Sequence, residues 1–267
     1  MLMVSTIKTR FKTLLPKHVK TILRKHDLRE YMASQAMVRL IVGADGDRYE
    51  GWIATDKDVL DLLRDVDWAF YFESNPVDAI LSEHVWEHLD CRAALVAAQN
   101  CFTYLKPGGY IRVAVPDGLH PDEEYIDRVK PGGWGEGSDD HHVLYTYRTL
   151  EAVFALAGFE TTLLEYFDER GTFHYQEWSP ADGMIKRSSR YDSRNRIREL
   201  AYTSIILDAR KPVEDSSHRR TVTPKLEQEA SGSVRNGRVL YVTKPCTGKR
   251  GKERIEKGMG ASQGGVL

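Results

Sequence analysis

The chain has 267 residues, enough for one α/β domain of ordinary size with extensions at its ends. Its net charge of −1 is unevenly distributed. Residues 1–29 hold 8 basic and 1 acidic residue, residues 213–267 hold 11 and 6, and the part between them holds 19 and 32. That middle part, with a net charge of −13, argues against nucleic acid as the main partner of the folded domain.

Cysteine spacing and hydropathy argue against a disulfide-rich secreted protein and against a membrane-spanning protein. The three cysteines show no CxxC spacing, so the sequence signals neither a disulfide framework nor a zinc site, which is typical of a reducing compartment. No stretch approaches the roughly 20 apolar residues of a membrane span, and the N-terminus lacks a continuous signal-peptide core. We therefore expect a cytoplasmic protein.

The N-terminal segment, residues 1–36, is basic. Within residues 4–25 the apolar residues fall near one helical face with lysines and arginines between them, which predicts a helix interrupted at Pro16. Two interpretations stay open. The helix packs on the domain, or it makes peripheral contact with an anionic membrane surface.

The first two predicted strands carry a glycine turn and an acidic residue at their ends. The first strand, residues 38–42 (VRLIV), continues into GADG, the glycine turn of residues 43–46. Glycine lets the backbone approach a ligand closely. The second strand, residues 52–55, ends at Asp56, which can accept hydrogen bonds from both ribose hydroxyls of a nucleoside. The short stretch of chain between Gly43 and Asp56 leaves little room for a full helix between the two strands.

The position of the third strand is not decided by the sequence. Residues 58–63 contain valine and leucines that suit a short strand or a helical turn, and residues 68–72 form an aromatic cluster. We expect one of these two segments to supply the third strand.

The segment from Asp78 to Asp117 is expected to form the centre of the fold. Two short apolar strands flank a helix that ends at Tyr104, and a βαβ unit of this length requires parallel strands and a right-handed crossover. Pro107 and Gly108 suit a type II turn that opens the second of these strands. Ligands bind beyond the carboxyl ends of parallel strands. The ligand-binding residues are therefore expected within residues 82–84 and 116–117.

The chain after Asp117 is expected to contain a polar loop, a helix, two strands and a tail. In the loop, residues 139–142 (DDHH) suit a metal cluster, a substrate loop or a solvated turn. A helix over 149–157 precedes strands at 159–167 and 202–209, which should pair as an antiparallel hairpin at the sheet edge, with a polar, aromatic insertion between them. Residues 213–267 are expected to be a disordered basic tail. Within it, only the VLYVT run at 239–243 suits an ordered element.

The glycine turn, Asp56 and the motifs DAILSEHVWEHL and YLKPGGYIRVAVPD together resemble class I S-adenosylmethionine (SAM)-dependent methyltransferases of the methyltransferase-type-11 kind, over about residues 37–211. The resemblance implies a methyltransferase domain over residues 37–212. Its expected fold is a doubly wound α/β fold with a seven-stranded, mostly parallel sheet, Rossmann-like, and an antiparallel final hairpin. It also implies SAM as the cofactor. The implied cofactor-binding residues are Gly43, Ala44, Asp45, Gly46, Asp56 and Glu83.

Asp45 departs from the pattern of these enzymes, which commonly have glycine at this position. Its carboxylate would lie beside the amino-acid end of SAM, which carries one positive and one negative group. If it faces the ammonium group it strengthens binding, and if it faces the cofactor's carboxylate it weakens binding. The sequence leaves both orientations open.

Three residues are candidates for a catalytic base, which methyl transfer needs only when the acceptor is a hydroxyl or a protonated amine. They are His84, Asp117 and His141. The expected acceptor is a small molecule or a glycan rather than nucleic acid, and the sequence does not indicate the oligomeric state. Two alternatives remain: a non-catalytic SAM-binding domain, and a zinc hydrolase that uses the HVWEH motif. We assign no metal ligands.

Overall fold

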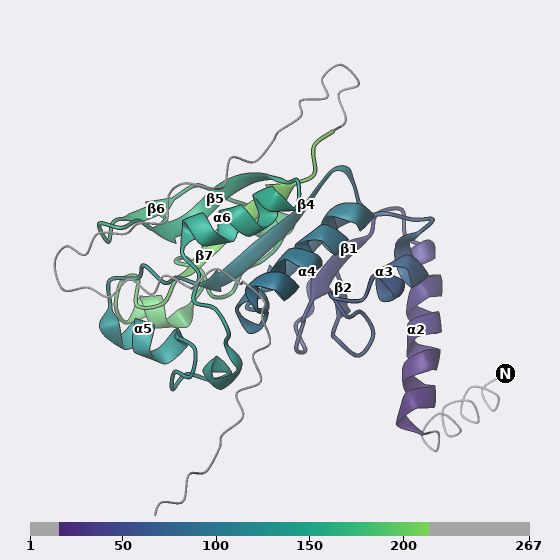
Figure 1. Cartoon of the computed structure of the whole chain (residues 1–267), viewed down its shortest axis with the longest axis horizontal. Coiled ribbons are helices and arrows are strands. Elements are labelled where there is room, and N and C mark those ends of the chain that lie inside the picture. The colour runs from purple at the N-terminus through teal and green to yellow at the C-terminus, as the bar shows by residue number, and fades with distance from the viewer. Residues whose placement is uncertain (1–15, 214–267) are drawn as a thin grey trace, which may run out of the picture. The chain divides into compact units, whose positions relative to one another are not determined.

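The computed structural model of the protein describes residues 16–213, all of which belong to one compact unit (Figure 1). The predictions for residues 1–15 and for the tail from residue 214 onward, including the run at 239–243, lie outside the described residues.

One mixed sheet of seven strands forms the centre of the described unit, in the order β2-β1-β3-β4-β7-β5-β6. The strands are β1 (Arg39–Val42), β2 (Ile53–Thr55), β3 (Val77–Glu83), β4 (Leu105–Pro116), β5 (Glu160–Phe167), β6 (Phe173–Tyr175) and β7 (Ser204–Arg210). The β2-β1-β3-β4 part is parallel, β7 runs antiparallel to both β4 and β5, and β6 runs antiparallel to β5. Five of the seven strands therefore point in one direction.

Five α-helices and four short 3-10 helices connect these strands within residues 16–213. They are α2 (Lys17–Ala33), α3 (Asp65–Phe72), α4 (Cys91–Tyr104), α5 (Glu123–Val129), α6 (Tyr147–Leu156), η1 (Trp86–His88), η2 (Ser138–Asp140), η3 (Pro180–Asp182) and η4 (Ser193–Arg196). Asp90 begins α4 because its side chain accepts a hydrogen bond from the Ala93 amide. The predicted βαβ unit is confirmed as β3-α4-β4.

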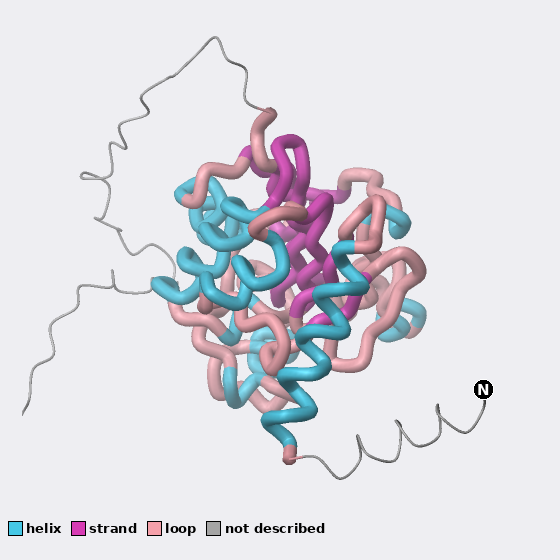
Figure 2. The backbone as a smooth tube through the Cα atoms, turned by 90° about the vertical axis from the view of Figure 1, so that its right-hand side faces the viewer, coloured by secondary structure: helices cyan, strands magenta, loops and turns pink. Residues whose placement is uncertain are grey.

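The two faces of the sheet are covered differently. Helices α3, α4 and α6 pack on one face, where the larger core contains buried residues such as Trp68, Ala97 and Phe154. The opposite face is covered by the β1-β2 connection and by residues 176–196, which we call the covering segment. Trp52, Trp178 and Ile185 from these loops pack there against the strands. Figure 2 shows helices gathered on one side of the strands and mostly loop on the other.

The predicted fold class is confirmed, since the chain forms a Rossmann-like α/β domain with a seven-stranded mixed sheet whose last strands are antiparallel. Two details of the prediction are wrong: the origin of the third strand and the position of the final hairpin at the sheet edge. Neither residues 58–63 nor residues 68–72 form a strand. Trp68, Tyr71 and Phe72 instead face the core from α3, at the spacing of one helical face.

The seventh strand is β6, which comes from the insertion between β5 and β7. As a result the β5-β7 hairpin does not lie at the sheet edge. β7 lies inside the sheet between β4 and β5, and β6 takes the edge.

Helix α2 begins directly after Pro16, where the predicted interruption lies. Arg24 and Lys25 form ion pairs with Asp58 and Asp67 at 2.9 and 3.0 Å, so two basic residues of this helix contact the sheet-bearing part of the chain. None of the described helices combines the length and apolar content that crossing a membrane requires. The boundary expected at residues 36 and 37 stays a prediction.

Candidate active site

A cleft of about 880 Å³ lies at the carboxyl ends of β1 and β3. Four parts of the chain line it: the glycine turn, the residues that follow β3, the loop between α5 and η2, and the covering segment. The parallel arrangement of β1, β3 and β4 brings these ends to one edge of the sheet, which is where ligands bind in open α/β sheets.

The glycine turn has a backbone conformation that requires glycine at its first position. Gly43 has a φ of +60°, and a Cβ atom added there would lie 2.6 Å from Cγ2 of Val85. Asp45 also lies in the left-handed region, with a φ of 40°. Its amide donates a 2.9 Å hydrogen bond to Oδ1 of Asp56. The acidic residue after the second strand is therefore in direct contact with the turn.

Glu83 ends β3 and is bound to the covering segment. Its carboxylate accepts hydrogen bonds from the amides of Lys186 and Arg187 at 3.1 and 2.8 Å. The Lys186 ammonium also forms an ion pair with Asp47, just after the glycine turn. Glu83 lines the cleft, but its oxygens already hold the covering segment in place.

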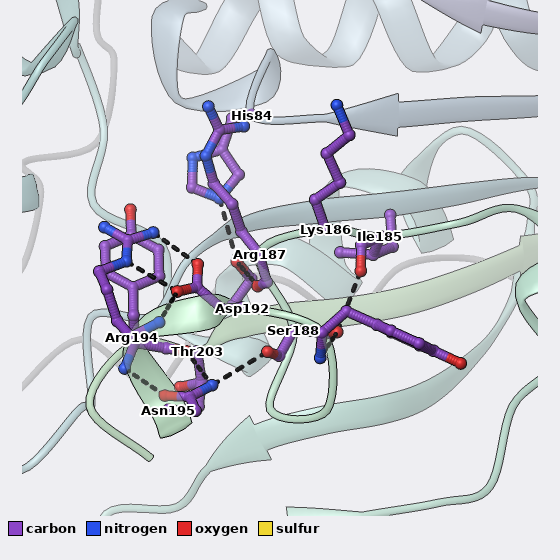
Figure 3. A network of polar contacts seen from close by, with 12 residues as sticks. His84, Ile185, Lys186, Arg187, Ser188, Asp192, Arg194, Asn195 and Thr203 are labelled. Carbon is purple, nitrogen blue, oxygen red and sulfur yellow. Dashed lines mark hydrogen bonds and ion pairs between the residues drawn. The ribbon is translucent and has the colours of Figure 1, made fainter. Parts of the chain in front are cut away.

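His84 has both ring nitrogens occupied. Its backbone is left-handed, with a φ of 56°. Nε2 lies 3.0 Å from Oγ of Ser204, whose hydroxyl donates to the Arg187 carbonyl at 2.7 Å, so Nε2 must be the donor to Ser204. Nδ1 lies 3.1 Å from Oε1 of Glu87. Figure 3 shows His84 beside Arg187 in this network. A ring engaged on both sides is poorly suited to accept a proton from a substrate.

Glu87 is 1 % exposed and is one of the residues that line the cleft. Burial acts to raise its pKa, but the interaction with the neighbouring His84 ring outweighs burial and holds the pKa below its ordinary value. Neither carboxylate oxygen accepts a hydrogen bond from the described residues, so the contact with His84 is an ion pair without hydrogen-bond alignment.

His88 and His141 present their rings to the cleft from two separate segments. Their ring centroids lie 4.8 Å apart, nearly perpendicular. Nδ1 of His141 lies 2.7 Å from the Val129 carbonyl, and Nδ1 of His88 lies 3.2 Å from the Asp140 carbonyl. A carbonyl can only accept, so in both rings Nδ1 carries a hydrogen, and in the neutral form of each ring Nε2 keeps a lone pair. Burial lowers the pKa of His141, which favours the neutral ring.

Asp117 does not line the cleft. It is fully buried, and its carboxylate accepts hydrogen bonds from the amides of Leu119 and Phe167 at 2.9 and 2.7 Å. Burial raises its pKa to about 7. The structure thus brings His84 and His141 to the cleft and assigns Asp117 a contact between the ends of β4 and β5.

Several residues of the cleft were not singled out from the sequence. They are Arg128, Trp134, Lys186, Arg194 and Tyr202. The Arg194 guanidinium lies 3.3 Å from the centre of the Tyr202 ring and forms an ion pair with Asp192 at 2.6 Å. The insertion that contains Lys186 and Arg194 was recognisable as polar and aromatic, but nothing in its pattern showed which side chains reach the cleft.

The lining of the cleft suits SAM at four of the six positions that the resemblance assigns to it, which are Gly43, Ala44, Asp45 and Glu83. Gly43, Ala44 and Asp45 line the cleft, and the Asp56 carboxylate lies beside them at the end of β2, where a ribose acceptor is expected. The cleft volume falls within the roughly 300–1,000 Å³ of small-molecule sites. One oxygen of Asp56 already accepts the Asp45 amide, which orients the carboxylate and leaves Oδ2 available.

Comparison with known proteins gives one informative match. The profile of a family described as methyltransferase domain matches residues 25–164, more than half of the chain. A search of curated proteins found no match. Solved structures give similarities at low identity, so the family assignment rests on the family profile alone.

Three of these structures come from microbial proteins. A SAM-dependent methyltransferase from Archaeoglobus fulgidus has 15 % identity and a TM-score of 0.39, over 72 % of this chain and 94 % of that one. A putative methyltransferase from Haloferax volcanii, in complex with its Trm112 activator, has 12 % identity and a TM-score of 0.37, over 71 % and 94 %. A possible histamine N-methyltransferase from Thermotoga maritima has 11 % identity and a TM-score of 0.39, over 75 % and 98 %.

The family match agrees with the glycine turn, with Asp56 beside it and with the cleft at the carboxyl ends of the parallel strands. The chain belongs to the methyltransferase domain family and is a SAM-dependent methyltransferase.

Proposed function

We propose that the protein transfers the methyl group of SAM to an oxygen atom of a small polar molecule or a glycan, which binds in the cleft beside His88 and His141. The observation that carries this proposal is the continuity of the cleft. The same space is lined by Gly43 and Asp45 and by the two histidines. Cofactor and acceptor can therefore lie in contact, as an in-line transfer requires.

The class of acceptor is supported by the lining and by charge. Polar side chains alternate with aromatic rings around the cleft, among them Tyr49, Tyr202 and the 59 % exposed Trp134. Such rings offer flat apolar faces to a small ligand, while the polar groups fix its orientation. The net charge of −13 over residues 30–212 disfavours a polyanionic nucleic acid.

The cofactor supplies an electrophilic methyl group, so a bond forms from the acceptor oxygen to the methyl carbon while the carbon–sulfur bond breaks and the acceptor loses its proton. Of the three candidate bases, His141 is the one whose ring keeps a lone pair at the cleft. His84 is engaged through both nitrogens, and Asp117 lies outside the cleft. His141 is therefore the residue that we assign to activation of the acceptor hydroxyl.

The test combines binding and turnover. Calorimetry with SAM and with its demethylated product, S-adenosylhomocysteine, should show binding of both to the full chain. Release of S-adenosylhomocysteine is then measured with collections of hydroxylated small molecules and oligosaccharides. His141→Ala should lower the transfer rate at least a hundredfold and leave SAM binding unchanged, since general-base catalysis contributes about 10²–10⁴-fold.

The exposed neighbour His142 provides the matched control, and His142→Ala should leave both SAM binding and methyl transfer unchanged. Failure of the full chain to bind SAM and S-adenosylhomocysteine would overturn the proposal. Binding without transfer to any acceptor of these classes would favour the non-catalytic SAM-binding alternative. The zinc-hydrolase alternative is not supported, because His84 and His88 do not lie on one helical face: His84 precedes η1 with a left-handed backbone.

A further inference from the structure

Three potential metal ligands meet at the end of the cleft that we assign to the acceptor. Glu87, His88 and His141 each offer one ligand atom, and these atoms all lie within 4.8 Å of one another. Glu87 and His88 belong to η1, while His141 follows η2 more than fifty residues later. The amides of His142 and Val143 donate to the Glu87 carbonyl at 2.7 and 3.2 Å, so backbone hydrogen bonds hold the two segments together.

The two imidazoles have the tautomer that a metal ligand needs. Each Nδ1 donates to a backbone carbonyl, that of Val129 for His141 and that of Asp140 for His88. Metal-binding histidines almost always donate their second ring nitrogen to such an acceptor, which fixes the ring and directs the other lone pair to the ion. Within residues 16–213, no hydrogen bond involves Nε2 of either ring.

The buried carboxylate of Glu87 is a second, independent observation that points to a bound cation. Its carboxylate is 1 % exposed, and neither oxygen accepts a hydrogen bond within the described part of the chain. A buried carboxylate left in this state is costly unless a positive charge balances it. The nearest cationic group is the ring of His84, with Nδ1 at 3.1 Å from Oε1, and this contact lacks hydrogen-bond alignment. The Glu87 carboxylate thus remains available to a cation at its other oxygen.

From these contacts we propose that Glu87, His88 and His141 form a binding site for a divalent first-row transition-metal ion, with Zn²⁺ the best fit. Two neutral imidazoles and one carboxylate are the ligands of catalytic zinc sites that keep one position open. Magnesium and calcium prefer sites built entirely from oxygen ligands, so the two imidazoles disfavour both. Ligand atoms around zinc lie about 3.4 Å apart, given bonds of about 2.0–2.2 Å, so the side chains move inward when the ion binds.

The position of this site deepens the proposed function, on which this step rests. All three ligands line the cleft, so the open coordination position faces the space assigned to the acceptor. An acceptor hydroxyl bound to the ion through its oxygen would release its proton to solvent water more readily, because a bound divalent ion lowers the pKa of a coordinated oxygen group. His141 then acts as a ligand of the ion that activates the acceptor, rather than as the base itself.

The experiment measures metal binding to the full chain without SAM or acceptor. After dialysis against a chelator, the protein is titrated with Zn²⁺ by calorimetry and with Co²⁺ by visible absorption, which reports coordination by nitrogen ligands. We expect one ion per chain. His141→Ala and Glu87→Gln should each weaken binding at least tenfold, since loss even of a residue that only supports a ligand costs 10–100-fold. His142→Ala should bind as the wild type does.

Circular dichroism and SAM binding confirm that each variant is folded, and Glu87→Gln keeps the side-chain volume if His141→Ala does not fold. Absence of stoichiometric Zn²⁺ and Co²⁺ binding would overturn the metal site. Binding of equal affinity in wild type and His141→Ala would overturn it too, because the ion would then be held elsewhere in the chain. Both outcomes leave SAM binding and methyl transfer intact, so this proposal can fail independently of the proposed function.

Discussion

The buried carboxylate of Asp117 gives the sharpest prediction about stability and pH. Its two oxygens accept the amides of Leu119 and Phe167, which connects the end of β4 to the end of β5. Asp117→Asn keeps the shape of the side chain but replaces one accepting oxygen by a donating NH₂ group. One buried amide then loses its acceptor, which costs about 1–3 kcal/mol of the free energy of unfolding.

The cost should depend on pH, because burial raises the pKa of Asp117 from 3.8 to about 7. The folded protein therefore keeps this proton to higher pH than the unfolded chain does. The contribution of Asp117 to stability is fully present below about pH 4 and falls as the pH rises towards 7. Three pH units correspond to about 4 kcal/mol as an upper bound. Asparagine does not titrate, so the wild type should lose stability relative to Asp117→Asn over this range.

The assay is denaturant unfolding of wild type and Asp117→Asn at pH 5 and pH 8. The difference between the two proteins removes the titration of all other groups. We expect the wild type to be favoured more at pH 5 than at pH 8, while methyl transfer per folded molecule changes less than threefold. If the stability advantage of the wild type over Asp117→Asn instead grows with pH, the pKa of Asp117 is not raised. Loss of transfer at unchanged stability would return Asp117 to the list of catalytic residues.

Two further predictions concern the cofactor. Asp56→Ala should weaken SAM binding by about 1.5–3 kcal/mol, the range for hydrogen bonds to a charged acceptor, measured by calorimetry. Asp56→Asn should lose less, since an amide oxygen can still accept the Asp45 amide, and equal affinity of all three proteins would exclude Asp56 from the site. Asp45→Gly should also weaken SAM binding, as expected if the carboxylate faces the cofactor's ammonium. Binding at least tenfold tighter, or about 1.4 kcal/mol, would show instead that Asp45 faces the cofactor's carboxylate.

Much of the fold was predictable because its strands and helices follow simple patterns. Residues 38–42 and 52–55 are apolar and short, and residues 91–104 repeat apolar side chains at helical spacing, so these elements were assigned to the right type and nearly the right bounds. The third strand was predicted wrongly because Trp68, Tyr71 and Phe72 were interpreted as an aromatic cluster. Their spacing of three and four residues is also that of a helix face, and packing against α4 selects the helix.

The candidate site was only partly predictable, since a pattern shows where a strand ends but not where the next side chain points. Asp117 follows β4, as predicted, yet its side chain points into the protein and accepts a hydrogen bond from Phe167, fifty residues away. His84 was placed correctly at the end of β3. Its left-handed backbone and its contact with Ser204, 120 residues later, have no local signal.

The covering segment explains why the rest of the site depends on distant residues. Glu165 accepts hydrogen bonds from Nε1 of Trp178 and from the Ser189 amide, both at 2.8 Å. Arg112 binds Asp208 through two hydrogen bonds, at 2.7 and 2.8 Å, and donates to the carbonyl of Gly183 at 2.9 Å.

These buried contacts lie on the sheet face opposite the helices, where Trp178 and Ile185 complete the smaller core. The next residues, Lys186 and Arg187, donate their amides to Glu83 at the edge of the cleft. One continuous segment thus covers the sheet and lines the cleft. Because the same backbone does both, the position of Arg187 and Arg194 at the cleft is determined by the packing of Trp178 and Ile185 rather than by any pattern within the segment itself.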